Sequence, residues 1–250
     1  MEPNPSIERT YRRVQAGTGL VFASFLFLHL LNVAFALVPG GYDRAQAALR
    51  LFYQFPPVEA LLAGCLVAHG YVGIRLAIAR RKRNERPSRT VRLVRLAGWF
   101  LLLAMAGHVG ATRISAIVSG HPPGAAGLGF TLEYLPWVFG PYYAALGLLG
   151  LLHVAKGLGT AVRMLGPSMR RFLAPADVLG RWMLRVGAPL VVIGLLGLGG
   201  ILYATPDPFA HPFAGVVRAM VAGVLDVPRS REEHRAVSRG QGSRGARASR

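Results

Sequence analysis

The chain of 250 residues contains a single cysteine, Cys65, and only eleven aspartates and glutamates. One cysteine excludes a disulfide framework, a cysteine-ligated iron–sulfur cluster and a cysteine-rich zinc site. Charged residues make up 16% of the chain, against about 25% in a soluble domain, which is too few for an ordinary soluble surface. Hydrophobic residues make up 52% and the mean hydropathy is +0.39, so the chain is also too apolar to be disordered.

The scarce acidic residues face 29 lysines and arginines, which gives a formal net charge of +18. Such a charge is typical of nucleic-acid binding or of another anionic partner. The apolar composition opposes nucleic-acid binding. The position of the positive charge relative to the apolar segments therefore decides how it is interpreted.

Five apolar stretches are long enough to cross a bilayer, which takes about 20 helical residues. None alternates with period 2 as a barrel strand does, so we expect helices. The expected spans are Gly17 to Val38, Val58 to Ala79, Leu96 to Val118, Leu135 to Ala161 and Leu184 to Tyr203. The first stretch is longer than the core of about 7–15 residues in a cleaved signal peptide, so we expect it to be retained.

The connections are expected to be short loops, including a small-residue loop from Gly124 to Gly129 before the fourth span. The apolar patch 213–225 contains Arg218 and is shorter than a span, which favours an interfacial helix. Residues 226–250 are rich in Arg, Ser and Gly, which predicts a disordered basic tail. The sequence thus predicts an all-α membrane protein, with a bundle of five transmembrane helices in residues 1–212.

The distribution of basic residues predicts the orientation of these spans. With a cytoplasmic N-terminus, the inner segments carry sixteen Lys and Arg, and the outer loops before the tail carry only Arg44, Arg50 and Arg113. We therefore expect the N-terminus inside and, after five spans, the C-terminus outside. The Arg-rich tail opposes this orientation, because it places seven arginines on the outer side.

Four of the seven histidines lie inside the expected spans, one in each of the first four: His29, His69, His108 and His153. An ionisable side chain in hydrocarbon is costly and is a functional candidate for that reason. The alternative for each one is a neutral imidazole that is hydrogen-bonded to a neighbouring helix. His121, His211 and His234 lie in loops or in the tail and are assigned no role.

The depth of these histidines suggests two pairs. At 1.5 Å per residue, His29 and His108 lie about 18 Å from the inner ends of their helices, His69 about 15 Å and His153 about 12 Å. Two histidines on facing helices suit axial ligation of a haem, whereas zinc usually needs three or four protein ligands. A proton relay is disfavoured because no acidic residue lies deep in a span. Small residues such as Gly73, Ala104 and Gly150 lie one turn from these histidines and favour either a porphyrin or close helix packing.

Several other residues have two interpretations. Arg75, Arg92, Arg95 and Lys156 could pair with haem propionates, or could mark the inner membrane interface. The aromatic residues at the outer ends of the spans could line a quinone pocket, but an interfacial belt is favoured; they are Tyr42, Tyr134, Trp137, Tyr142 and Tyr143.

The sequence resembles a known family in four short motifs: RVQAGTG from Arg13 to Gly19 followed by FLHLLN from Phe27 to Asn32, HGYVGIR from His69 to Arg75, HVGATR from His108 to Arg113, and His153 on the fourth helix. Each motif is weak alone, but their order over five spans is more specific. Together they are similar to the cytochrome b membrane anchors of succinate dehydrogenases and fumarate reductases, of the five-helix, di-haem type. The resemblance covers residues 8–204.

The resemblance implies a bacterial cytoplasmic-membrane subunit with two b haems, the inner one on His69 and His153 and the outer one on His29 and His108. It implies Gln15 near the inner propionates and electron transfer between a cytoplasmic iron–sulfur subunit, itself joined to a flavoprotein, and menaquinone or another quinone. Such a subunit does not carry the dicarboxylate chemistry itself. Candidates for the quinone site are Asn32, Asp43, Glu59 and Arg113. Two other classes stay open: a haem-free anchor that binds quinone, and a di-haem cytochrome b of a hydrogenase or formate dehydrogenase.

Overall fold

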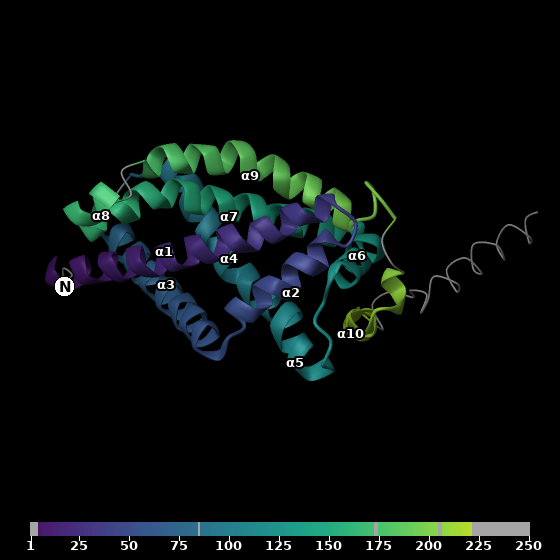
Figure 1. The fold of residues 1–250 in the computed structure, drawn as a ribbon. Helices are drawn as coiled ribbons and strands as arrows, with labels where there is room; N and C mark the ends of the chain where they lie inside the picture. The colour runs from purple at the N-terminus through teal and green to yellow at the C-terminus, as the bar shows by residue number, and fades with distance from the viewer. Residues whose placement is uncertain (1–4, 85, 173–174, 205–206, 222–250) are drawn as a thin grey trace, which may run out of the picture.

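A computed structural model describes residues 5–84, 86–172, 175–204 and 207–221. All regular elements in these ranges are helical (Figure 1). The long helices are α1 (Pro5–Ala34), α3 (Pro56–Lys82), α4 (Arg89–Val109), α7 (Pro136–Leu165) and α9 (Ala176–Leu198). The short ones are η1 (Phe35–Leu37), α2 (Gly41–Tyr53), the π-helical turn η2 (Gly110–Ile114), α5 (Ser115–Ser119), α6 (Ala125–Tyr134), α8 (Pro167–Phe172), η3 (Pro208–Ala210) and α10 (Pro212–Val221).

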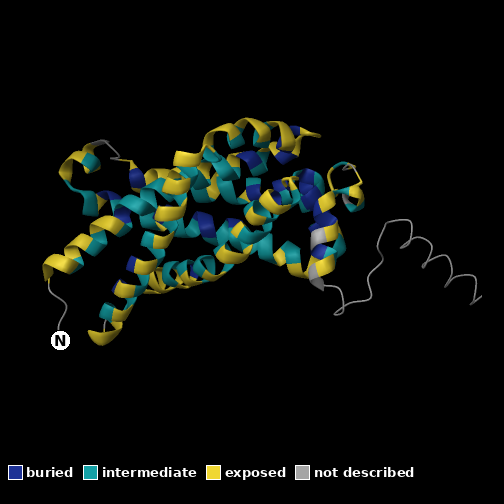
Figure 2. Cartoon of the chain, turned by 90° about the horizontal axis from the view of Figure 1, so that it is seen from below, coloured by how far each residue is buried: buried dark blue, intermediate teal, exposed yellow. Residues whose placement is uncertain are grey.

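Among the described residues, five helical segments are long and apolar enough to cross a membrane, as the sequence predicts. They are α1 with η1, α3, α4 with η2 and α5, α7, and α9. Many of their exposed residues are large and apolar; Leu103 is 76% exposed and Val67 is 72% exposed. Figure 2 shows in yellow the exposed positions along these helices. Exposed apolar surface of this extent suits a lipid environment, so the chain is a multi-pass membrane protein.

The first, third and fifth helices differ from their expected boundaries. Helix α4 begins at Arg89 rather than Leu96, and α9 begins at Ala176 rather than Leu184. Helix α1 begins at Pro5 rather than near Gly17, because Glu8 supports its polar first turns. The Glu8 carboxylate accepts hydrogen bonds from Arg12 one turn on and from Arg83 at the end of α3, at 2.5 and 2.7 Å. Helix α9 ends at Leu198 rather than Tyr203, because Gly200 adopts a positive φ of 73° and turns the chain.

Two connections expected as loops are helices. Helix α2 follows the first span, and α6 replaces the expected small-residue loop from Gly124 to Gly129. The backbone N–H of Ala125 donates to Asp43 Oδ1 at 2.8 Å, so a side chain of α2 satisfies the first turn of α6. This hydrogen bond joins residues that are 82 positions apart, and local sequence patterns give no sign of it.

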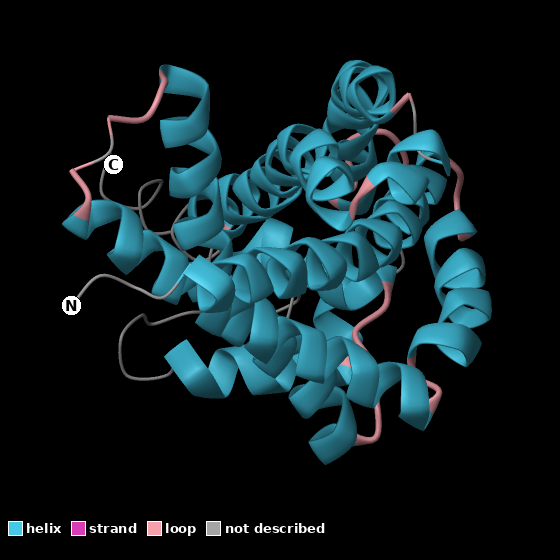
Figure 3. Cartoon of the chain, turned by 90° about the vertical axis from the view of Figure 1, so that its left-hand side faces the viewer, coloured by secondary structure: helices cyan, strands magenta, loops and turns pink. Residues whose placement is uncertain are grey.

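Helices α1, α3, α4 and α7 surround a common interior, and α9 lies outside it (Figure 1). Figure 3 shows the same helices from the left-hand side of Figure 1. Helix α1 packs between α3 and α7. Helix α7 also packs against α4 and α9. The contacts of α9 are unusually close at three glycines. At each of them an added Cβ atom would lie within 2.5 Å of a backbone carbonyl oxygen. The distance is 2.3 Å from Gly180 to Ala155, 2.5 Å from Gly194 to Val33 and 2.1 Å from Gly197 to Ala36. Glycine at these positions lets α9 touch the backbones of α7, α1 and η1 directly.

The patch expected as an interfacial helix forms α10 within the described residues. Phe213, Ala214 and Val217 of α10 are buried in a cluster with Phe130 of α6. The apolar face of α10 therefore packs on protein. Residues 222–225 and the expected tail at 226–250 lie outside the described residues.

The close contact at Gly197 gives a testable prediction for stability. We expect Gly197→Ala to destabilise the protein by about 1–3 kcal/mol, because the added methyl group meets a backbone carbonyl that cannot rotate away. The control is Gly64→Ala on α3, where a Cβ atom meets nothing within 4 Å. Thermal denaturation in detergent should give a lower melting temperature for Gly197→Ala alone. Equal melting temperatures for the two variants would contradict the packing described.

Candidate functional site

The four histidines of the spans meet in two pairs across the interior of the bundle. The ring centroids of His29 on α1 and His108 on α4 are 6.0 Å apart, with an interplanar angle of 80°. Those of His69 on α3 and His153 on α7 are 6.2 Å apart, with an angle of 77°. These are the pairs that the depth argument favours. They are stacked along the bundle, with the second pair closer to the Lys- and Arg-rich connections, here called the basic end.

Hydrogen bonds define which nitrogen of His69 carries the proton. Thr18 Oγ1 lies 3.0 Å from His69 Nδ1 and 2.8 Å from the carbonyl oxygen of Val14, to which it donates its one proton. Thr18 Oγ1 therefore accepts from His69 Nδ1–H. This leaves the lone pair of His69 on Nε2, where a metal ion could be bound.

His153 has the same tautomer for a different reason. Its Nδ1 lies 3.2 Å from the carbonyl oxygen of Val94 on α4, an atom that can only accept. His153 Nδ1 must therefore be protonated, and its Nε2 carries the lone pair. A donated N–H that orients the ring is the usual second-shell support of a metal-bound histidine.

The other pair lacks such support. In the described part of the chain, the rings of His29 and His108 have no hydrogen-bond partner, although the Phe25 ring stacks on His29 at 5.6 Å. A polar ring inside an apolar bundle without a partner costs free energy, which a bound ligand would remove.

The spacing of both pairs fits two axial ligands on one metal ion. Imidazole nitrogens bind metals such as zinc at about 2 Å, so two rings in trans on one ion have centres about 6 Å apart. Within the residues described, no three His, Cys, Asp or Glu side chains gather at a possible metal site. The arrangement therefore suits an ion whose other ligands come from a macrocycle such as a porphyrin.

Glycines on the facing helices make room for the rings of the basic-end pair. A Cβ atom on Gly19 of α1 would lie 3.3 Å from His69 Cε1, and one on Gly98 of α4 would lie 3.0 Å from His153 Cε1. Any larger residue at Gly98 would displace the imidazole. These glycines belong to helices that do not carry the histidine they face, and sequence spacing alone does not reveal them.

The structure separates the five propionate candidates into two groups. Gln15 lies against Gly73, one turn from His69, at 3.4 Å from the position of a Cβ atom there. Arg95 is half-buried, and its Nε is buried without a hydrogen-bond partner next to Val94, which binds His153. Arg75, Arg92 and Lys156 are exposed. Of the five candidates, Gln15 and Arg95 thus lie closest to the surroundings of His69 and His153.

At the opposite end, two of the quinone-site candidates meet. Arg113 Nη2 donates to Glu59 Oε2 at 2.7 Å, and Arg113 Nε donates to Glu59 Oε1. Arg113 lies in the π-helical turn that directly follows His108 on its helix, and π-turns are frequent at functional sites. Asn32, one turn after His29, is only 2% exposed, and its Oδ1 has no hydrogen-bond partner.

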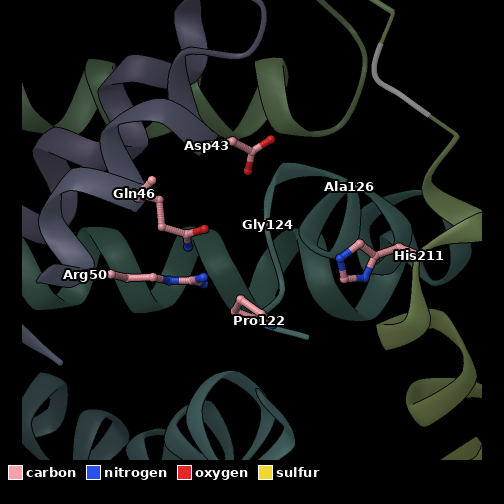
Figure 4. A pocket seen from close by; sticks show the side chains of 8 residues that line it. Asp43, Gln46, Arg50, Pro122, Gly124, Ala126 and His211 are labelled. Atoms are coloured by element: carbon pink, nitrogen blue, oxygen red, sulfur yellow. The ribbon is translucent and has the colours of Figure 1, made fainter. Parts of the chain in front are cut away.

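Asp43, the remaining candidate, lines a cavity of about 280 Å³ at this end (Figure 4). Gln46 and Arg50 of α2 and His211 also line it, and Arg50 Nε is buried without a partner. His211 Nδ1 accepts from the backbone N–H of Phe213 at 3.1 Å, so Nε2 carries its proton. Burial and the nearby His121 lower the pKa of His211, against the opposing effect of Asp43. The cavity therefore offers N–H donors beside one carboxylate.

Aromatic rings connect this cavity to His29. Tyr53 lies one turn after Arg50 on α2, and the Tyr53 ring meets Phe25 edge-on at 5.8 Å. Phe25 in turn stacks on His29. No sequence motif marks Gln46, Arg50, Tyr53 or His211. The only early signal for Gln46, Arg50 and Tyr53 is the amphipathic pattern of residues 41–53, within a connection expected to be a loop. His211 has no such signal and was assigned no role.

The aromatic residues expected as a belt have mixed positions. Trp137 is 88% exposed, as a belt residue should be. Tyr142 instead donates to the carbonyl oxygen of Ala104 at 3.3 Å, and the hydroxyls of Tyr143 and Thr131 are 3.1 Å apart. These two tyrosines join α7 to α4 and α6.

Comparison of the chain with protein-family models, with curated proteins and with solved structures gives no match.

The ion pair between Glu59 and Arg113 gives a second prediction. We expect a coupling free energy of about 1 kcal/mol, because the pair is bidentate but about a third exposed. Thermal denaturation of the native protein, Glu59→Gln, Arg113→Gln and the double variant should show that the second substitution costs less once the first is present. Additive effects of the two substitutions would show that the contact does not stabilise the fold.

Proposed function

We propose that the chain is the cytochrome b membrane anchor of a succinate dehydrogenase or fumarate reductase complex in a bacterial cytoplasmic membrane. The observation that carries the electron-transfer role is the spacing of about 6 Å between the rings of both histidine pairs. In this proposal His69 and His153 hold one b haem at the basic end, and His29 and His108 hold the second. The choice of complex rests on the four sequence motifs.

A haem with histidines at both axial positions supplies one-electron transfer and leaves no open position for oxygen. The residues of the chain fix its ligands in place. Thr18 and the carbonyl group of Val94 hold the imidazoles of His69 and His153 with Nε2 free. Arg95 and Gln15 lie where carboxylates of the macrocycle would need a cation and an amide donor.

The quinone belongs at the end of the bundle opposite the basic one. Reduction of a quinone takes up protons, and its carbonyl oxygens accept hydrogen bonds. The cavity beside Asp43 offers the N–H groups of Arg50 and His211 to a carbonyl oxygen and the Asp43 carboxylate to a hydroxyl group. Tyr53 and Phe25 fill the space between this cavity and His29, so it lies on the side of the proposed outer haem.

The basic end faces the soluble partners in this proposal. A cytoplasmic N-terminus follows from the sixteen Lys and Arg of the inner segments, which also offer docking surface to an iron–sulfur subunit that is joined to a flavoprotein. Co-purification of these two subunits with the chain supports this complex. A hydrogenase or formate dehydrogenase subunit in their place would overturn it while leaving the haem assignment intact.

Haem content tests the central claim. We expect a pyridine haemochrome assay on the full chain, expressed with haem supplied, to give about two b haems per chain. A flat reduced-minus-oxidised spectrum would instead indicate a haem-free anchor.

Single substitutions test the pairing. His69→Leu and His153→Leu should each remove the same haem, and His29→Leu and His108→Leu the other one, so that about half the absorbance remains in each case. His121→Leu is the matched control, because its exposed side chain binds only the carbonyl group of Ser119. Loss of a different haem by the two members of one pair would contradict the assignment. Far-ultraviolet circular dichroism of each variant separates this result from misfolding.

Arg95 and Arg92 form a matched pair for the propionate assignment. They lie three residues apart on α4, but Arg95 Nε is buried and Arg92 is exposed. A nearby cation stabilises the reduced haem, so Arg95→Gln should lower the midpoint potential of the His69–His153 haem, and Arg92→Gln should change it little. Redox titration followed by absorbance gives both potentials. Equal shifts in the two variants would indicate a general loss of surface charge.

A further inference from the structure

The basic end contains a second cavity, which takes no part in the proposed haem and quinone sites. It has a volume of about 530 Å³ and lies where α7, α8 and α9 meet at the basic end (Figure 1). Three arginines and one aspartate line it: Arg163, Arg170, Arg171 and Asp177. The cavity thus lies between helix ends, where the apolar spans α7 and α9 meet the basic end.

Most of the positive charge of the cavity is not neutralised by protein groups. Arg163 pairs with Asp177 at 3.8 Å and also donates to Thr160 at 3.2 Å. Arg170 and Arg171 are exposed and make no ion pair with any described residue. Asp177 is held against the backbone of Gly159, where an added Cβ atom would lie 2.2 Å from its Oδ1. The single carboxylate is therefore committed to Arg163, and two guanidinium groups stay available for an anion.

Further exposed arginines lie next to the cavity on the part of α9 that leads into the apolar span. Arg181 and Arg185 follow Asp177 at four-residue spacing on the same face of α9, and both are exposed. Trp182, 58% exposed, and Val186 lie beside them on the apolar face of this helix. Guanidinium groups above an apolar face with a tryptophan match the head group and acyl chains of a lipid.

We propose that this cavity binds the phosphate of an anionic phospholipid, with the acyl chains along the exposed face of α9. Arg170 and Arg171 bind the phosphate oxygens, and Arg163 closes the cavity with Asp177. Basic pockets between transmembrane helices at the cytoplasmic side bind anionic head groups in this way. The test of this site uses the chain alone, without haem or partner subunits, so it does not depend on the proposed complex.

Native mass spectrometry of the full chain in detergent, with equal amounts of phosphatidylglycerol and phosphatidylcholine added, measures this preference. We expect phosphatidylglycerol to be retained in excess. Each arginine near a lipid surface favours an anionic lipid about fivefold, so Arg170→Gln with Arg171→Gln should lower the preference by up to about thirtyfold. The control, Arg81→Gln with Lys82→Gln, removes two exposed charges at the end of α3 that do not line the cavity, and it should lower the preference much less.

A gain-of-binding variant guards against simple loss of structure. Asp177→Asn removes the only carboxylate of the lining, so it should raise the preference for phosphatidylglycerol about fivefold. Equal retention of the two lipids by the native chain would overturn the proposal, as would an equal loss in the Arg170/Arg171 and Arg81/Lys82 variants. Replacement of chloride by inorganic phosphate at the same ionic strength should not release the lipid; its release would assign the cavity to free phosphate instead.

Discussion

Direct backbone contact at three glycines of α9 determines how the other helices can be arranged. Because Gly180, Gly194 and Gly197 touch carbonyl groups of Ala155, Val33 and Ala36, α9 is held against α7 and α1 at the shortest possible distance. This contact fixes α1 and α7 side by side, and α3 and α4 then complete the enclosure on the other side. The one long helix without a histidine is thus the one outside the interior. Its role is to hold the frame on which the histidine pairs depend.

The two pairs inside this frame are held in different ways. The rings of His69 and His153 are oriented by Thr18 and by a carbonyl group, and Gly19 and Gly98 leave room for them. His29 is held by stacking on Phe25, and neither it nor His108 has a hydrogen bond in the described chain. In the proposed function, the first pair is preorganised for its haem and the second gains its orientation on binding. The rings of His29 and His108, the pair on the side of the cavity of Arg50 and His211, are therefore freer to move. In the proposed function this is the end where the quinone enters and leaves.

Periodicity and composition were sufficient for the parts of the structure that depend on local chemistry. The apolar runs predict all five long helices, and counting residues along them is enough to pair His29 with His108 and His69 with His153. The expected start of α1 was wrong because a distant residue, Arg83, supports its first turns. The expected end of α9 was wrong because Gly200 turns the chain before Tyr203. Helix α6 was missed because its first turn is supported by Asp43, 82 positions away. Helix α2 has an amphipathic pattern that was not used. Arg95 and Arg75 also look alike in sequence, but in the structure Arg95 is half-buried with its Nε fully buried, whereas Arg75 is exposed.

The π-helical turn from Gly110 to Ile114 has a consequence for how the third span tolerates change in length. A π-turn holds one residue more than an α-helical turn, so every side chain after it is rotated by about 100° relative to a regular helix. Arg113 meets Glu59 in this shifted register. Deletion of one residue from the turn would restore a regular helix and keep the span, but it would rotate α5 away from its present neighbours. The third span therefore contains one residue more than a regular helix of the same length. Loss of that residue would change the hydropathy of the span very little, but it would separate Arg113 from Glu59.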